Sequence, residues 1–283
     1  MYSASIEITE GCDWNLCTFC WLYKDPRAQF FRKRSRTDIF KDLKRVKSSL
    51  SFATNFFLGG SSAICSETTV LCDVLQFINQ NFPHPQHISS YARASDILEK
   101  KNDDLKKLHN YGLQTIYMGI ETGSASLLKM CKKGITPEEI INASKKVMHT
   151  GFKLSVNVIL GLGGKKFSKE HIVETTRILN SINPHMIRFR TLHITPNSPL
   201  YLNMLLGVFE ELRPREVLKE QYSILKELTV TSDVFNDHFS NYTKFCGSLP
   251  EEKNEMLSIL ENIIDNPQIK LSRKDLTFEF FER

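Results

Sequence analysis

The strongest constraint on the fold is a regular alternation of strand-like and helix-like segments. Runs rich in β-branched, aromatic and aliphatic residues predict strands, and the amphipathic segments between them predict helices. The predicted strands cover residues 5–9, 54–58, 87–92, 115–121, 153–160 and 186–194. The predicted helices cover residues 38–50, 66–81, 102–111, 136–150 and 168–182. Successive strand–helix units of this kind favour a parallel sheet with right-handed crossovers.

The number of units decides between architectures. Six units are two short of a closed eightfold barrel, so we expect an α/β fold, a partial (β/α)6 TIM-like barrel. We expect residues 1–204 to form this core and residues 205–283 to form a helical C-terminal extension packed on it. The chain has 283 residues, of which 41% are hydrophobic, and this is enough for a core of that size.

Composition argues against a disordered or membrane-spanning chain. Charged residues make up 24% of the chain and the net charge is only +5, which is not the pattern of a disordered protein. No apolar run approaches the roughly 18 residues of a membrane span. The first residues lack the basic and apolar regions of a secretory signal, so we expect a cytoplasmic protein.

Positive charge is concentrated between Lys24 and Lys47, a segment that contains ten basic residues and only three acidic ones. This excess raises the alternative of an RNA-binding or RNA-modifying protein, although no RNP-like aromatic motif or GXXG clamp accompanies it. Four of the basic residues are interpreted as the solvated face of the helix at 38–50: Lys41, Lys44, Arg45 and Lys47. The interpretation of Arg32, Lys33, Arg34 and Arg36, which precede that helix, stays open.

Unusual residues follow each predicted strand. In a parallel barrel the carboxyl ends of the strands form the face where active sites assemble. The segments are Cys12–Cys20, Gly59–Ser62, Arg93–Asp96, Glu121–Gly123, Gly161–Gly164 and Thr195–Asn197. Their shared placement predicts a functional site at that face.

Three cysteines demand a chemical explanation. Cys12, Cys17 and Cys20 follow the first strand with the spacing Cys-x4-Cys-x2-Cys, and thiolates are soft ligands for iron and zinc. A structural zinc site needs a fourth ligand, and the chain has no second Cys-x2-Cys and no His-x3–5-His. Three ligands would leave one iron of a 4Fe–4S cluster open to a small molecule. The other cysteines are interpreted as small buried hydrophobes: Cys65, Cys72, Cys131 and Cys246.

Together these features resemble the radical S-adenosylmethionine (radical SAM) superfamily. The three-cysteine loop, the Gly59-Gly60 element and the partial barrel are similar to that family over about residues 5–200. Three later segments resemble its elongator-like and oxygen-independent coproporphyrinogen oxidase-like branch: Gly119–Gly123, Lys132–Glu138 and Val158–Gly163. Asp237–Tyr242 is similar to a segment of small stand-alone members.

The resemblance implies a role for each matching residue. Cys12, Cys17 and Cys20 would bind three irons of a 4Fe–4S cluster, and S-adenosylmethionine would chelate the fourth iron. The resemblance implies that Phe19 and Ile159 lie against the adenine of S-adenosylmethionine, and that Gly59, Gly60 and Ser61 lie near its methionine amino group. It also implies that Arg93 or Ser95, together with Glu121 and Asn157, face the ribose and the methionine polar groups. Lys133 would be the basic partner of the carboxylate.

The resemblance also implies the reaction. An electron from a flavodoxin or ferredoxin would cleave S-adenosylmethionine to methionine and a 5′-deoxyadenosyl radical, which would abstract hydrogen from a small-molecule substrate. The sequence assigns no catalytic acid or base and does not identify the substrate. Arg188 and Arg190 share one face of their strand and would bind a carboxylate or phosphate if that face is inward, or play a structural part if it is outward. His171 and His185 are expected at the surface.

Two departures from the family pattern keep an alternative open. The usual spacing is Cys-x3-Cys-x2-Cys, so this loop has one extra residue and must bulge. The acid that usually follows the two glycines is replaced by Ser61. The longer spacing also matches plant-type 2Fe–2S ferredoxins, with Cys65 as the fourth ligand, so an electron-transfer protein is the alternative. An electron carrier does not need six strand–helix units.

Overall fold

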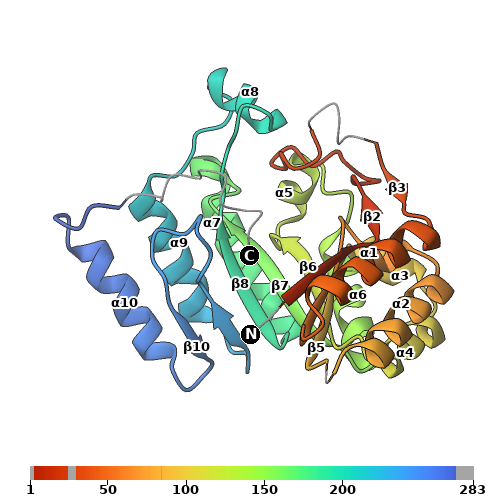
Figure 1. The fold of residues 1–283 in the computed structure, drawn as a ribbon. Helices are drawn as coiled ribbons and strands as arrows, with labels where there is room; N and C mark the ends of the chain where they lie inside the picture. Colours follow the sequence, from red (N-terminus) through yellow and green to blue (C-terminus); the bar gives the residue numbers. More distant parts are fainter. Residues whose placement is uncertain (1–2, 25–29, 84, 272–283) are drawn as a thin grey trace. The chain divides into compact units, whose positions relative to one another are not determined.

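A computed structural model describes residues 3–24, 30–83 and 85–271 of the chain. Within them one sheet has eight strands in the order β1-β4-β5-β6-β7-β8-β9-β10, and β2 pairs with β3 separately (Figure 1). The strands are β1 (Ser3–Glu7), β2 (Thr9–Glu10), β3 (Arg32–Lys33), β4 (Asn55–Gly59), β5 (His87–Ala92), β6 (Thr115–Glu121), β7 (Lys153–Leu160), β8 (Met186–Thr191), β9 (Asp233–Phe235) and β10 (Cys246–Ser248). The expected α/β fold with an open, largely parallel sheet is confirmed.

The helices fall between the strands, as the alternation predicts. They are α1 (Arg36–Ser49), η1 (Ala63–Cys65, a 3-10 turn), α2 (Thr68–Asn81), α3 (Ala94–Glu99), α4 (Asn102–Asn110), α5 (Ala125–Met130), α6 (Pro137–His149), α7 (Gly164–Ile182), α8 (Pro199–Leu205), α9 (Pro214–Glu227) and α10 (Lys253–Asp265). None of those in the described ranges is both long enough and apolar enough to cross a bilayer.

The chain divides into two compact units made of interleaved segments. The first comprises residues 1–15, 22–119 and 142–154, and the second comprises residues 16–21, 120–141 and 155–283. The division of the chain at residue 204 stays a prediction.

The first unit is built on parallel pairing of β1 with β4, β4 with β5 and β5 with β6. One face of these strands carries buried residues such as Ile6, Leu58 and Ile88. Helix α1 begins at a Ser35 cap that accepts a hydrogen bond from Asp38 N, and it buries Ile39 and Leu43, so the predicted solvated face of this helix is confirmed. The other sheet face carries an aromatic cluster of Phe57, Tyr91 and Tyr117, with ring centroids 4.9–6.1 Å apart.

The second unit is built on parallel pairing of β7 with β8 and of β8 with β9, and β10 closes this edge by antiparallel pairing with β9. Helix α7 packs against α9, and α9 packs against α10. The segment after residue 204, expected to be helical, therefore also contributes two strands. Each of these strands has only three residues, too few for a visible alternation of polar and apolar side chains.

Several element boundaries differ from the expected ones, and two of the differences have identifiable reasons. β1 ends at Glu7 because Thr9 and Glu10 leave the main sheet and pair with Lys33 and Arg32. Helix α7 begins at Gly164, four residues before the expected capping residue Ser168. Gly164 has φ = +54°, and a Cβ there would lie 2.5 Å from the carbonyl oxygen of Glu210. This glycine therefore allows close packing at the helix start.

Candidate functional site

The cysteine loop follows β2, and its extra residue is accommodated by a left-handed turn. Cys12 belongs to the first unit, whereas Cys17 and Cys20 belong to the second. Asn15 has φ = +39°, a conformation that asparagine tolerates better than most residues. Its backbone N–H donates to Cys12 Sγ at 3.5 Å, and its side-chain amide donates to the carbonyl oxygen of Tyr23 at 2.8 Å. The predicted bulge is thus a turn at Asn15.

The three thiols fit an iron–sulfur cluster by their chemistry. All three are half-buried, so they are accessible to a metal, and Cys12 Sγ already accepts a backbone N–H, a contact typical of cluster-bound sulfur. Over the ranges that the structure describes, no group of three or more His, Cys, Asp or Glu side chains is gathered in position to hold a metal ion. The ligand set Cys12, Cys17 and Cys20 therefore stays a prediction.

The remaining cysteines are poor candidates for ligands, although the expected burial holds fully only for Cys72 and Cys131, since Cys65 is half-buried and Cys246 is exposed. Burial raises the pKa of the Cys131 thiol to about 12 and that of Cys65 to about 11, so both stay protonated. The Cys65 thiol also donates to the carbonyl oxygen of Ser62 at 3.1 Å. Cys72 is buried as expected, but Cys246 is exposed because it lies on the edge strand β10.

The segment that carries Cys17 and Cys20 is tied to two elements of the second unit. The backbone N–H of Thr18 donates to the carbonyl oxygen of Cys131 at 2.9 Å, and the Thr18 carbonyl accepts from Leu200 N at 2.8 Å. Phe19 and Ile159 pack against one apolar cluster, formed by Cys131, Leu162, Leu192, Leu200 and Phe209. The two residues expected against the adenine therefore lie over the same apolar surface.

Glu121 and Lys133 form an ion pair that the sequence did not predict. Lys133 Nζ lies 2.7 Å from Glu121 Oε1 and 5.9 Å from the centre of the Phe19 ring. Burial disfavours the charged form of Lys133, but the carboxylate of Glu121 and the thiol group of Cys17 outweigh it, so its pKa is raised. Lys133 is therefore a fixed cation, and its ammonium group has two further donors beyond the one used by Glu121.

The two glycines at the end of β4, Gly59 and Gly60, allow residues of the neighbouring segment to approach closely. A Cβ on Gly59 would lie 2.3 Å from Glu7 Oε1, and one on Gly60, where φ = +101°, would lie 2.0 Å from Thr9 Oγ1. The hydroxyl oxygens of Thr9 and Ser61 are buried and have no hydrogen-bond partner among the described residues. Such orphaned polar atoms fit a place where a ligand supplies the missing partner.

Arg93 binds the cysteine loop. Its guanidinium lies 2.8 Å from Asp13 Oδ2 and 2.7 Å from Asp96 Oδ1, and its backbone N–H donates to Ser62 Oγ. Ser95, two residues after Arg93, is half-buried on α3. The geometry of Arg93 supports the position of the loop, and the expected contacts of Arg93 or Ser95 with S-adenosylmethionine stay predictions.

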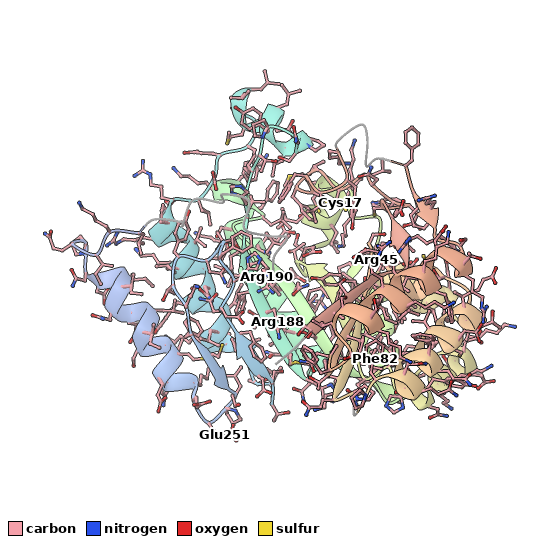
Figure 2. The ribbon with its side chains drawn as sticks, viewed as in Figure 1. Cys17, Arg45, Phe82, Arg188, Arg190 and Glu251 are labelled. Atoms are coloured by element: carbon pink, nitrogen blue, oxygen red, sulfur yellow. The ribbon has the colours of Figure 1, made fainter. Side chains whose placement is uncertain are left out.

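Strands β7 and β8 place three polar side chains, Asn157, Arg188 and Arg190, on one face of the sheet. Asn157 pairs with Arg188, and Ile159 pairs with Arg190. Paired neighbours in a sheet point to the same side, and the alternate residue Phe189 is buried on the other side. Asn157 Oδ1 is buried and makes no hydrogen bond among the described residues. Both arginines, which Figure 2 labels on β8, therefore share the sheet face of Asn157 and Ile159, and an inward direction of that face stays a prediction.

His171, expected at the surface, is fully buried in a polar network. Its Nδ1 lies 2.8 Å from Thr122 Oγ1, and its Nε2 lies 3.7 Å from Glu220 Oε1. Burial lowers the pKa of His171 despite the nearby Glu220, so the ring is neutral. Glu220 also accepts from Gly161 N at 2.6 Å. The network fixes the segments after β6 and β7, and the single histidine in a polar helix gave no sequence signal for it. His185 is exposed as expected.

The excess of basic residues between Lys24 and Lys47 is largely matched by acids in the fold. Arg34 contacts Glu10 and Asp42, at 3.3 and 2.7 Å. Arg32 pairs with Glu10 and Arg36 with Asp73, each at 2.7 Å. Residues 25–29, which include one arginine of the segment, lie outside the described residues. The paired arginines do not form an open basic surface.

Comparison with known proteins gives one family and several relatives. The family described as the radical SAM superfamily matches residues 6–179. The 4′-phospho-dehydrooxetanocin synthase of Priestia megaterium is 22% identical over 97% of this chain and 38% of its own length. Among solved structures, coproporphyrinogen III oxidase (HemN) of Escherichia coli has a TM-score of 0.61 with 16% identity, covering 80% of this chain and 52% of that one.

A further solved structure carries a cluster. The radical S-adenosylmethionine methyltransferase TsrM of Kitasatospora setae, with cobalamin and a [4Fe-4S] cluster bound, has a TM-score of 0.57 with 15% identity, covering 95% of this chain and 54% of that one. The chain thus spans between about a third and a little over half of these three proteins.

Proposed function

Because this chain belongs to the radical SAM superfamily, we propose that it is an enzyme that holds a 4Fe–4S cluster through Cys12, Cys17 and Cys20 and uses S-adenosylmethionine to start radical chemistry on a small-molecule substrate. The observation that carries the proposal is the family match over residues 6–179, which includes all three cysteines. We further propose a flavodoxin or ferredoxin as the electron donor and the cytoplasm as the compartment.

When bound, the cluster supplies the electron that cleaves S-adenosylmethionine. The residues of this chain would bind and orient that molecule. Phe19 and Ile159 provide an apolar surface that excludes water from the adenine side. The Lys133 ammonium group, held by Glu121, is suited to a carboxylate. The orphaned oxygens of Ser61 and Asn157 are suited to amino or hydroxyl donors.

The electron-transfer alternative has less support. A plant-type 2Fe–2S cluster needs a fourth thiolate, and the Cys65 thiol already donates to the carbonyl oxygen of Ser62 at 3.1 Å. RNA as a partner has no more support, because Arg32 and Arg34 before α1, and Arg36 at its start, are paired with acids of the same unit.

Replacing one predicted ligand tests the proposal. We expect the iron content of anaerobically reconstituted Cys17→Ala to fall from about four irons per chain to near zero, since the two remaining ligand thiols cannot hold the cluster. Folding should persist, because Thr18 anchors this segment through its backbone. Cys246→Ser, at an exposed position, is the matched control and should keep its iron. Equal iron and sulfide in the two variants, with circular dichroism unchanged, would reject the ligand assignment.

A further inference from the structure

The carboxyl group of Glu7 lies against the Gly59-Gly60 element. Glu7 is the last residue of β1 and pairs in register with Gly59 of β4, so the two residues are neighbours across the sheet. A Cβ on Gly59 would lie 2.3 Å from Glu7 Oε1 and 2.9 Å from Glu7 Oε2. Both carboxylate oxygens therefore occupy the space that a side chain at position 59 would fill, directly over the backbone of β4.

The negative charge of Glu7 is only partly compensated. Glu7 is exposed, and its carboxyl group accepts a hydrogen bond from Ser5 Oγ at 3.3 Å. The guanidinium of Arg34 contacts the carboxylates of Glu10 and Asp42, and it donates to the backbone carbonyl oxygen of Glu7. The protein atoms around the Glu7 carboxyl group desolvate it and raise its pKa, which neither Ser5 nor Arg34 fully offsets. A ligand with N–H donors would relieve this cost.

Two orphaned hydroxyl oxygens lie at the same element. Thr9 Oγ1 is 2.0 Å from the place of a Cβ on Gly60, and Thr9 is only 1% exposed. Neither Thr9 Oγ1 nor the buried Ser61 Oγ has a hydrogen-bond partner among the described residues. A cavity of about 340 Å³, a size found for small-molecule sites, is lined by Glu7 and Thr9. All of these residues belong to the first unit.

These groups have the chemistry that binds an amino group. A carboxylate offers only acceptors, and a hydroxyl oxygen can accept as well. A primary amino group keeps N–H donors even when its lone pair binds a metal. The family pattern places an acid directly after the two glycines, where this chain has Ser61. Glu7 brings a carboxylate to the same element from the neighbouring strand.

We infer that Glu7 supplies the acid that the chain lacks at position 61, and that its carboxylate, with the hydroxyl groups of Thr9 and Ser61, binds the α-amino group of S-adenosylmethionine. The inference rests on the proposed function, because it takes S-adenosylmethionine as the ligand of the Gly59-Gly60 element. It gives the last residue of β1 a part in selecting a ligand with a free amino group, which the sequence pattern did not assign.

Equilibrium dialysis of the full-length, reconstituted protein tests the inference with two ligands: S-adenosylmethionine and its analogue with hydrogen in place of the α-amino group. We expect Glu7→Gln to weaken binding of S-adenosylmethionine about tenfold or more and to change binding of the analogue little, because the analogue lacks the group that Glu7 contacts. Glu99→Gln, exposed at the end of α3, is the matched control and should bind both ligands like the unmodified protein. Equal losses for the two ligands in Glu7→Gln, or no loss for either, would overturn the inference.

A second variant separates binding from a structural role. Thr9→Val removes an orphaned hydroxyl, so we expect it to weaken S-adenosylmethionine binding severalfold without lowering the free energy of unfolding of the ligand-free protein, measured in urea. Lower stability with unaltered affinity would assign Thr9 to the fold and remove it from the site.

Iron content, measured on the same samples, reports on the proposed function separately. An unmodified protein that binds iron but no S-adenosylmethionine would contradict the proposed function and the inference together. S-adenosylmethionine binding that is as tight in Glu7→Gln as in the unmodified protein, with equal iron in both, would overturn the inference alone.

Discussion

Glu121 and Lys133 show how one pair of charges can serve both the fold and a ligand. Glu121 ends β6 with φ = +63°, a left-handed conformation that costs a non-glycine residue about 1 kcal/mol. Its contact with Lys133 at 2.7 Å offsets that cost and keeps the cation in a largely buried place. A charge fixed in advance loses little freedom when it binds a carboxylate.

Removing the acid should therefore affect the ligand and not the cluster. We expect Glu121→Ala to weaken S-adenosylmethionine binding about tenfold and to leave the iron content unchanged, because Lys133 loses the partner that orients it. Equilibrium dialysis of the reconstituted protein gives the affinity. Glu174→Ala, which removes only an exposed pair with Arg177, is the control. An unaltered affinity in Glu121→Ala would exclude this role for the pair.

His238 predicts a dependence of stability on pH. Its pKa is lowered from 6.5 to about 3 in the folded protein, by burial and by Arg190. The unfolded chain therefore binds a proton on this residue at a higher pH than the folded protein does. The stabilisation is complete above about pH 6.5 and is lost as the pH falls from 6.5 towards 3. We expect His238→Gln to lose less stability than the unmodified protein between pH 7 and 5, as measured by urea unfolding; parallel losses would contradict the assignment.

At the scale of elements, the turn after β4 packs closely against Thr9. Gly60 has φ = +101°, and an added Cβ would lie 2.0 Å from Thr9 Oγ1 and 2.6 Å from the Thr9 carbonyl oxygen. The backbone of this segment cannot move away easily, because the buried neighbours Leu58 and Ala63 flank it. Both the conformation and the available space therefore require glycine.

We expect Gly60→Ala to reduce the free energy of unfolding by about 2–4 kcal/mol, because a steric clash adds to the strain of a positive φ. Gly207→Ala is the matched control: its φ is +69°, but a Cβ there would meet nothing within 4 Å. This control should lose only about 1 kcal/mol. Urea unfolding of both variants gives the difference, and similar losses in the two would show that space at Gly60 is not limiting.

The elements that the sequence predicted well are those with a long, regular pattern. The strand at 115–121 and the strand at 153–160 match β6 and β7 residue for residue, because each alternates or runs apolar over seven or more residues. The helix at 102–111 differs from α4 by a single residue at its end. Short strands such as β9, and the early start of α7 at Gly164, depend on tertiary contacts that the local pattern does not contain.

For the whole molecule, the sequence allowed prediction of the fold class, but not of the side-chain contacts between its segments. The cysteines and glycines fall at strand ends, which the alternation alone reveals. The Glu121–Lys133 pair and the buried His171 join residues far apart in the chain, and no spacing rule predicts such pairs. The direction of Arg188 and Arg190 needed the register of β7 with β8.

Electron paramagnetic resonance of the anaerobically reconstituted, reduced protein tests the central claim most directly. Spectra recorded with and without S-adenosylmethionine report the cluster type and whether the molecule reaches an open iron. We expect a 4Fe–4S signal that shifts when S-adenosylmethionine is added. A 2Fe–2S signal, or a 4Fe–4S signal indifferent to S-adenosylmethionine, would contradict it and would favour electron transfer as the function.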